Sequence, residues 1–131
     1  MEINRKKIVI VDDDRTNLTI ARNALMDSYD VFTIPSGEKL FSILEKVTPD
    51  LILLDIEMPV MNGYEIIKIL KNSERTMNIP VIFLSGKEAP ESEKKALSLG
   101  AVDFILKPFS RENLLKSIEL HLPAANTPLV F

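Results

Sequence analysis

Four strand-like runs in the sequence, three of them apolar throughout, each end at residues that can do chemistry. The runs are Ile8–Val11, Leu51–Leu54, Val81–Leu84 and Val102–Leu106, and the polar residues that follow them are Asp12 to Asp14, Asp55, Ser85 and Lys107. Short apolar runs of this kind are typical of strands buried on both faces of a parallel sheet. The carboxyl ends of such strands form the rim where open α/β sheets bind ligands. Acids, a hydroxyl and a cation at this rim predict a chemical site.

The acids in particular predict a divalent metal site and phosphoryl transfer. If the first and third strands are neighbours, Asp12, Asp13 and Asp55 converge, and carboxylates that close repel one another unless a cation compensates. Lys107 supplies only one positive charge, so a hard ion such as Mg²⁺ (or Mn²⁺) is the natural completion. One carboxylate would then be the nucleophile and form an aspartyl phosphate. The metal and Lys107 would neutralise the phosphoryl oxygens, and the Ser85 hydroxyl would donate a hydrogen bond to one of them.

Strand and helix patterns alternate along the chain and place these residues. Strands are predicted near 7–12, 30–34, 50–55, 79–85 and 102–106, and helices near 15–27, 37–47, 63–72, 90–99 and 110–121. The helices follow from apolar residues at three- and four-residue spacing, such as Leu18, Ala21 and Leu25. This alternation predicts an α/β fold, with a doubly wound, five-stranded parallel sheet covered by helices on both faces.

Length and composition narrow the possible classes of protein. The 131 residues suit one domain with a real core, and a net charge of −3 gives no reason to expect direct nucleic-acid binding. The absence of cysteine excludes disulfides and thiol chemistry, and a single histidine, His121, argues against a histidine-based metal cluster. No apolar stretch approaches the roughly 20 residues needed for membrane insertion, and the first residues lack a signal-peptide core. We therefore expect a cytoplasmic domain over residues 1–122, followed by a tail or linker stub over 123–131.

Four motifs stand in order along the chain, each at the end of a predicted strand. They are Ile8–Asp14, Leu53–Gly63, Phe83–Gly86 and Lys107–Phe109. Together they resemble the receiver domain of response regulators, the phosphoacceptor domain of two-component signalling, and the resemblance covers roughly residues 6–121. It implies a flavodoxin-like (βα)5 fold with the strand order 2-1-3-4-5.

The same resemblance implies a signalling domain rather than an enzyme acting on a separate substrate. A histidine kinase or histidine phosphotransfer protein would donate the phosphoryl group, and the domain would catalyse only its own phosphorylation and dephosphorylation. Phosphorylation would change the surface formed by the fourth helix, fifth strand and fifth helix, and so its affinity for an unknown downstream effector.

The resemblance also assigns the phosphorylation and metal sites to single residues. Asp55 would be the phosphorylated residue. Asp12 and Asp13 would hold Mg²⁺ together with Asp55, with Asp13 as a direct ligand and Asp12 acting partly through water. The backbone carbonyl of Glu57 would complete the protein's share of the metal ligands.

Further positions would contact the phosphoryl group or respond to it. The resemblance implies that Ser85 and Lys107 contact the phosphoryl group, and that the peptide bond between Lys107 and the following proline is cis. Ser85 and Phe104 would be the switch residues. Glu57 and Lys87 would tune the phosphoryl lifetime, and we hypothesise that these two side chains pair across the site in the resting state.

Two other functions remain open from the sequence. The segment Asp12–Thr16 fits the DxDxT pattern of haloacid-dehalogenase phosphatases, in which Asp12 would be the nucleophile and Asp14 the acid and base. That alternative leaves Asp55 without a role, and Asp14 also suits a simple helix cap. The second alternative is a receiver that binds its partners without being phosphorylated.

Overall fold

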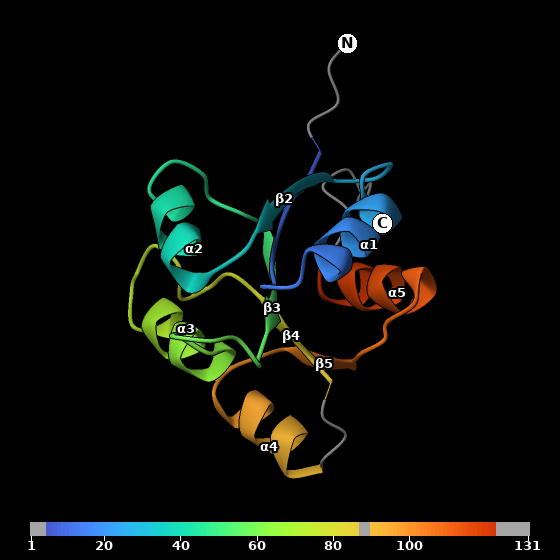
Figure 1. The fold of residues 1–131 in the computed structure, drawn as a ribbon. Helices are drawn as coiled ribbons and strands as arrows, with labels where there is room; N and C mark the ends of the chain where they lie inside the picture. The colour runs from blue at the N-terminus through green and yellow to red at the C-terminus, as the bar shows by residue number, and fades with distance from the viewer. Residues whose placement is uncertain (1–4, 87–89, 123–131) are drawn as a thin grey trace, which may run out of the picture.

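Strands and helices alternate strictly in the computed structural model, which describes residues 5–86 and 90–122 (Figure 1). The strands are β1 (Lys7–Val11), β2 (Asp30–Ile34), β3 (Leu51–Asp55), β4 (Val81–Ser85) and β5 (Asp103–Leu106). The helices are α1 (Arg15–Leu25), α2 (Gly37–Leu44), α3 (Gly63–Lys71), α4 (Pro90–Ser98) and α5 (Arg111–His121). All neighbouring strands are parallel, in the order β2-β1-β3-β4-β5. The predicted fold class and strand order are confirmed.

The predicted elements differ from the observed ones only at their ends. The strand predicted near 79–85 begins at Val81, because Pro80 has no backbone N–H to donate to a neighbouring strand. The helix predicted over 37–47 ends at Leu44, after which Lys46 N donates to Ile43 O at 2.9 Å in a tighter turn. The helix predicted over 15–27 ends at Leu25. Apolar spacing continues past these points, which is why the pattern overestimates the helices.

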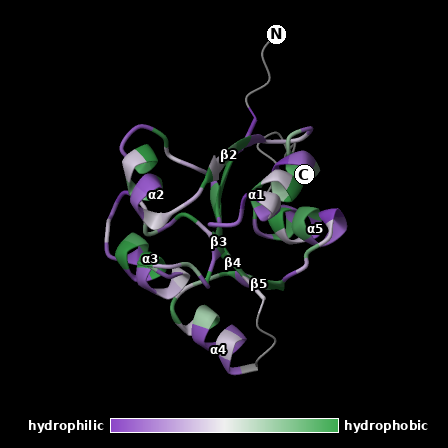
Figure 2. Ribbon diagram, in the orientation of Figure 1, coloured by the Kyte–Doolittle hydropathy of each residue, from purple (hydrophilic) through white to green (hydrophobic). Residues whose placement is uncertain are grey.

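Two apolar layers enclose the sheet. Successive strand residues point to opposite faces, so Val9 of β1 packs in the layer with α2, α3 and α4, while Ile10 packs in the layer with α1 and α5. Figure 1 shows these two groups of helices on either side of the sheet, and Figure 2 shows the strands as a hydrophobic centre. The segments Ile8–Val11, Leu51–Asp55 and Val81–Ser85 are buried throughout. This is the burial on both faces that their continuous apolar sequences predict.

Strand register brings the predicted site residues to one edge of the sheet. Val11 pairs with Leu54, Asp55 with Leu84, and Ser85 with Leu106. The residues that end or follow these strands therefore meet in space. Within the described ranges, no helix has both the length and the apolar character needed to cross a membrane. The proposed tail over 123–131 lies outside the described residues, so the boundary at 122 stays a prediction.

Local hydrogen bonds stabilise the first turns of α1 and α3 at the same edge of the sheet. Asp14 caps α1, and its Oδ1 accepts a hydrogen bond from Thr16 N at 2.8 Å. Asn62 and Glu65 form a capping box at the start of α3, with hydrogen bonds of 3.0 and 3.1 Å between each side chain and the other's backbone N–H. The side chain of Asp14 is thus engaged with its own helix, as a capping residue should be.

Candidate functional site

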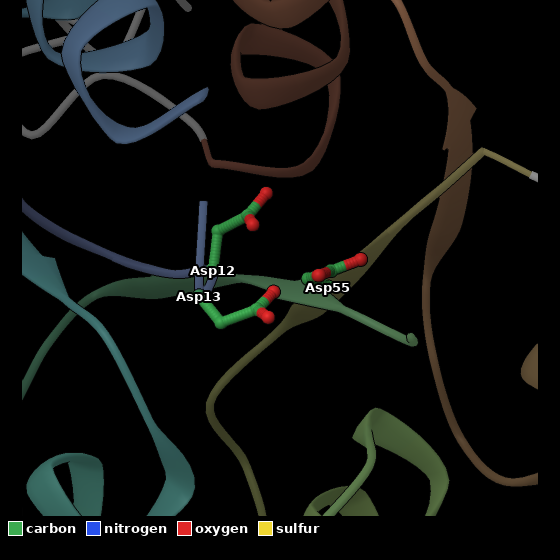
Figure 3. A group of neighbouring side chains, drawn as sticks. All are labelled: Asp12, Asp13 and Asp55. Carbon is green, nitrogen blue, oxygen red and sulfur yellow. The ribbon is translucent and has the colours of Figure 1, made fainter. Parts of the chain in front are cut away.

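Three carboxylates gather where β1 and β3 end (Figure 3). One oxygen each from Asp12, Asp13 and Asp55 can be chosen so that all three lie within 4.8 Å of one another. Asp12 and Asp55 are buried, with 0% and 1% of their surface exposed, whereas Asp13 is exposed. The structure thus brings together the three acids that the sequence predicts at this edge, two of them removed from water.

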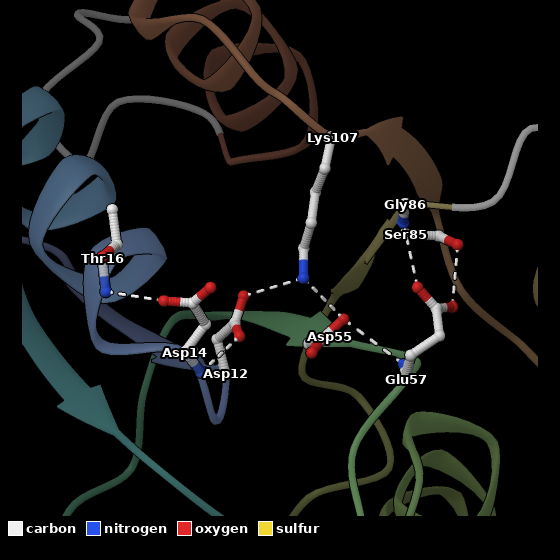
Figure 4. A network of polar contacts seen from close by, with 8 residues as sticks. All are labelled: Asp12, Asp14, Thr16, Asp55, Glu57, Ser85, Gly86 and Lys107. Atoms are coloured by element: carbon white, nitrogen blue, oxygen red, sulfur yellow. Dashed lines mark hydrogen bonds and ion pairs between the residues drawn. The ribbon is translucent and has the colours of Figure 1, made fainter.

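Lys107 lies between the two buried acids (Figure 4). Its Nζ donates a hydrogen bond to Asp55 Oδ1 at 2.8 Å and lies 3.0 Å from Asp12 Oδ2. Burial tends to lower the pKa of Lys107, but the Asp55 and Asp12 carboxylates outweigh it, and the pKa is raised. Lys107 therefore stays protonated and positively charged at this site. The Lys107–Pro108 peptide bond is cis, as the sequence resemblance implies.

Asp55 titrates near neutral pH in this environment. Burial raises the pKa of Asp55 to about 7; the charges of Asp12 and Glu57 also raise it, while Lys107 acts in the opposite direction. The one ammonium group does not offset burial and the neighbouring carboxylates. The site is therefore short of positive charge.

The oxygen atoms fit a hard divalent cation. Among the described residues, the buried Asp12 Oδ2 accepts no well-aligned hydrogen bond, although Lys107 lies close to it. The other oxygen of Asp12 accepts a hydrogen bond from Asp14 N at 2.9 Å. The ion pair with Lys107 offsets part of the cost of burying Asp12 Oδ2, but Lys107 shares its single charge with Asp55, so a second cation would stabilise the site further. Carboxylate oxygens grouped in this way are the ligands that Mg²⁺ and Mn²⁺ favour.

Ser85 and Glu57 form a second polar group beside Asp55 (Figure 4). Ser85 Oγ donates a hydrogen bond to Glu57 Oε2 at 2.8 Å, and Gly86 N donates to Glu57 Oε1 at 2.9 Å. The backbone N–H of Glu57 donates to Asp55 Oδ1 at 3.3 Å. These side-chain contacts do not follow from the sequence pattern, although the pairing of β3 with β4 places the two loops together. Lys87 lies outside the described residues, so its predicted pairing with Glu57 is untested.

Phe104 belongs to the surface formed by α4, β5 and α5. It is half-buried and lines an open groove of about 680 Å³ between these elements. In the same region, Ser117 Oγ donates to Asp103 Oδ2 at 2.5 Å, and His121 Nε2 lies 3.3 Å from that oxygen. The contact between His121 and Asp103 ties the end of α5 to β5.

The family model of the response regulator receiver domain matches residues 8–119. The chain belongs to this family. Receiver domains are the phosphoacceptors of two-component signalling, and the sheet order, the acidic cluster and the lysine of this chain agree with that function. The phosphatase alternative gains no support, and the Asp14 that it requires as acid and base caps α1 instead.

Relatives of this receiver domain include both large and small proteins. A probable cyclic di-GMP phosphodiesterase of Vibrio cholerae is 40% identical over 121 residues, which cover 92% of this chain and 27% of that protein. Protein PilG of Pseudomonas aeruginosa is 32% identical, over 90% of this chain and 88% of that protein. The structure of the chemotaxis protein CheY4 of Vibrio cholerae has a TM-score of 0.86 at 29% identity, covering 91% of this chain and all of that one. The chain spans 27%, 48% and 53% of the first three curated relatives that it matches.

Proposed function

We propose that Asp55 is the phosphoacceptor of this receiver domain. The observation that carries the proposal is the position of the buried Asp55 carboxylate, held by Lys107 and flanked by Asp12 at the carboxyl edge of the sheet. A histidine kinase or a histidine phosphotransfer protein is the proposed donor. The proposed output is a change in the affinity of the α4-β5-α5 surface for an effector. The chain itself would catalyse only the gain and loss of its own phosphoryl group.

Asp55 makes the new bond in this mechanism. Its carboxylate oxygen attacks the phosphorus of the donor phosphohistidine in line, the P–N bond breaks, and the electron pair leaves with the imidazole nitrogen. Lys107 holds Asp55 Oδ1 and so orients the nucleophile. Its charge, together with a hydrogen bond from the Ser85 hydroxyl, would offset the negative charge of the phosphoryl oxygens. Water later attacks the phosphorus of the acyl phosphate, the bond between phosphorus and the Asp55 oxygen breaks, and the free carboxylate and inorganic phosphate are released.

Asp12, Asp13, Asp55 and the backbone carbonyl of Glu57 are the groups proposed to hold Mg²⁺ or Mn²⁺. The bound ion would supply the positive charge that Lys107 alone does not provide for the phosphoryl oxygens. Asp12 Oδ2 favours this assignment because it is buried without a well-aligned hydrogen bond in the described part of the chain. Asp13 favours it because its carboxylate joins the cluster from the exposed side.

Ser85 and Phe104 are the proposed switch residues. They lie on neighbouring parallel strands, since β4 pairs with β5 and Phe83 lies opposite Phe104. Ser85 ends β4 beside Asp55, while Phe104 lines the groove at the α4-β5-α5 surface. A shift of Ser85 towards the phosphoryl group would therefore act on the strand that carries Phe104. The tuning role of Lys87 stays a prediction.

Mg²⁺ is expected to stabilise the folded protein through Asp13. A ligand that binds only the native state, at a hundred times its dissociation constant, adds about 2.7 kcal/mol to the free energy of unfolding. We expect Asp13→Asn to lose most of the Mg²⁺-dependent rise in melting temperature. Asp14→Asn removes one negative charge from the neighbouring exposed residue, which caps α1. This variant should retain the Mg²⁺-dependent rise in melting temperature. A full Mg²⁺-dependent rise in Asp13→Asn would contradict the assignment of this ligand.

Intact-mass spectrometry after incubation with acetyl phosphate tests the proposed phosphoacceptor. We expect one phosphoryl adduct that needs Mg²⁺, disappears in Asp55→Asn and persists in Asp14→Asn. An adduct that survives Asp55→Asn but is lost in Asp12→Asn would transfer the nucleophilic role to Asp12. If neither acetyl phosphate nor a phosphorylated histidine kinase labels the wild-type protein, the proposal is rejected.

A further inference from the structure

The Glu57 side chain accepts hydrogen bonds from two donors beside the proposed phosphoacceptor (Figure 4). Its two carboxylate oxygens accept separately from Ser85 Oγ at 2.8 Å and from Gly86 N at 2.9 Å. Ser85 is fully buried, and Glu57 is half-buried. Hydrogen bonds to an ionised acceptor are roughly twice as strong as those between neutral groups. Glu57 is thus held firmly in the unphosphorylated protein.

A carboxylate presents two anionic oxygens to these donors, as a phosphoryl group would. A serine hydroxyl has one hydrogen to donate, so Ser85 cannot donate to Glu57 and to a phosphoryl oxygen at once. Glu57 stands two residues after Asp55, and its backbone N–H already donates to Asp55 Oδ1 at 3.3 Å. Its side chain therefore competes for Ser85 from directly beside the phosphoacceptor.

We infer that Glu57 acts as a resting-state clamp, its carboxylate taking the place of phosphoryl oxygens on Ser85 and Gly86 until phosphorylation displaces it. The inference rests on the proposed phosphorylation of Asp55. It gives Ser85 two mutually exclusive acceptors, one for each signalling state. A phosphoryl group on Asp55 would also repel the Glu57 carboxylate, so that opening of the clamp is coupled to phosphorylation.

The clamp should weaken the binding of any phosphoryl analogue. Apparent affinity falls in proportion to the fraction of molecules in the binding-competent state. Removing the competing carboxylate in Glu57→Ala is therefore expected to tighten beryllofluoride binding in the presence of Mg²⁺ about fivefold. Isothermal titration calorimetry measures this change. The amide resonance of Gly86 in the protein without ligand should also shift, because its acceptor is lost.

Glu57→Asp separates the clamp from a simple effect of charge. This variant keeps the negative charge, but its side chain is one methylene shorter and cannot reach both donors in the same way. We expect Glu57→Asp to bind beryllofluoride more tightly than the wild type, like Glu57→Ala. Wild-type affinity in Glu57→Asp would mean that Glu57 acts only through its charge, and would overturn the clamp. Glu112→Ala removes an exposed charge on α5 and serves as the background control, with wild-type affinity expected.

The wild-type protein distinguishes failure of the clamp from failure of the proposed function. If the wild type binds no beryllofluoride at any Mg²⁺ concentration, the phosphoacceptor assignment itself is rejected. If the wild type binds and Glu57→Ala binds equally or more weakly, only the clamp is rejected.

Discussion

Without divalent ions and above about pH 7, Asp55→Asn is expected to be more stable than the wild type, by on the order of 2 to 4 kcal/mol. The Asp55 carboxylate is buried, and burial raises its pKa from the usual 3.8 to about 7. Ionising this group at neutral pH therefore costs stability in the folded state. The amide of asparagine has a similar shape and carries no charge. Lys107 would still lie 3.0 Å from Asp12, so the variant leaves no buried cation alone.

The pH dependence of this effect follows from the protons bound in each state. Between about pH 4 and about pH 7, folded Asp55 keeps a proton that the unfolded chain has released. The contribution of Asp55 to the free energy of unfolding of the wild type therefore falls as the pH rises through this window. Asp55→Asn has no ionisable group at this position, so its stability does not change with pH for this reason. The stability difference should be small below about pH 4, grow up to about pH 7, and then level off.

Urea denaturation across this pH range, with a chelator present, measures the difference. Asp14→Asn controls for the loss of one negative charge, because it removes a carboxylate from an exposed position at the same edge of the sheet. Added Mg²⁺ should narrow the gap between Asp55→Asn and the wild type, since the ion offsets the repulsion that the variant abolishes. Equal stabilities of the two proteins at low and neutral pH would contradict the raised pKa of Asp55.

Gly63→Ala is expected to lower the free energy of unfolding by about 3 kcal/mol, at the upper end of the usual cost of overpacking. A Cβ atom at Gly63 would lie 2.6 Å from the backbone oxygen of Asp55 and 2.9 Å from Ile56 Cα. These backbone atoms lie at the end of β3 and in the residue after it, and they cannot rotate out of the way as the end of a side chain can. The start of α3 and the end of β3 would have to separate, which would displace Asp55.

Gly37→Ala is the matched control, because Gly37 is also the first residue of a helix. A Cβ atom there would meet Ile66 Cδ1 at 2.9 Å and Met61 Sδ at 3.0 Å, both near the ends of flexible side chains. These atoms can move by small rotations, so we expect a loss below about 1 kcal/mol. Thermal denaturation compares the two variants, and Mg²⁺ binding should weaken only in Gly63→Ala. Equal losses of stability in both would show that the contact with Asp55 is not decisive.

Much of the fold could be predicted because burial on both faces leaves a plain pattern in the sequence. A strand such as β3 must be apolar at every position, whereas a covering helix such as α1 is apolar on one side only. The two patterns alternate, so a helix connects each strand to the next. Such a helix carries the chain back along the sheet, and successive strands therefore run parallel. Helix ends were less predictable. The apolar spacing of α2 continues to Val47, but local hydrogen bonds end the helix at Leu44.

The sequence by itself determined which residues meet at the site, since the carboxyl ends of parallel strands share one edge of the sheet. Asp12, Asp55, Ser85 and Lys107 each end or follow a strand, and no long-range information beyond strand order was needed to bring them together. Only the tertiary structure decided how their atoms pair. Side-chain rotamers and burial determine three features of the site. They are the position of Lys107 between two buried acids, the raised pKa of Asp55, and the hydrogen bond from Ser85 to Glu57. Those follow from packing across the whole fold, which periodicity along the chain does not contain.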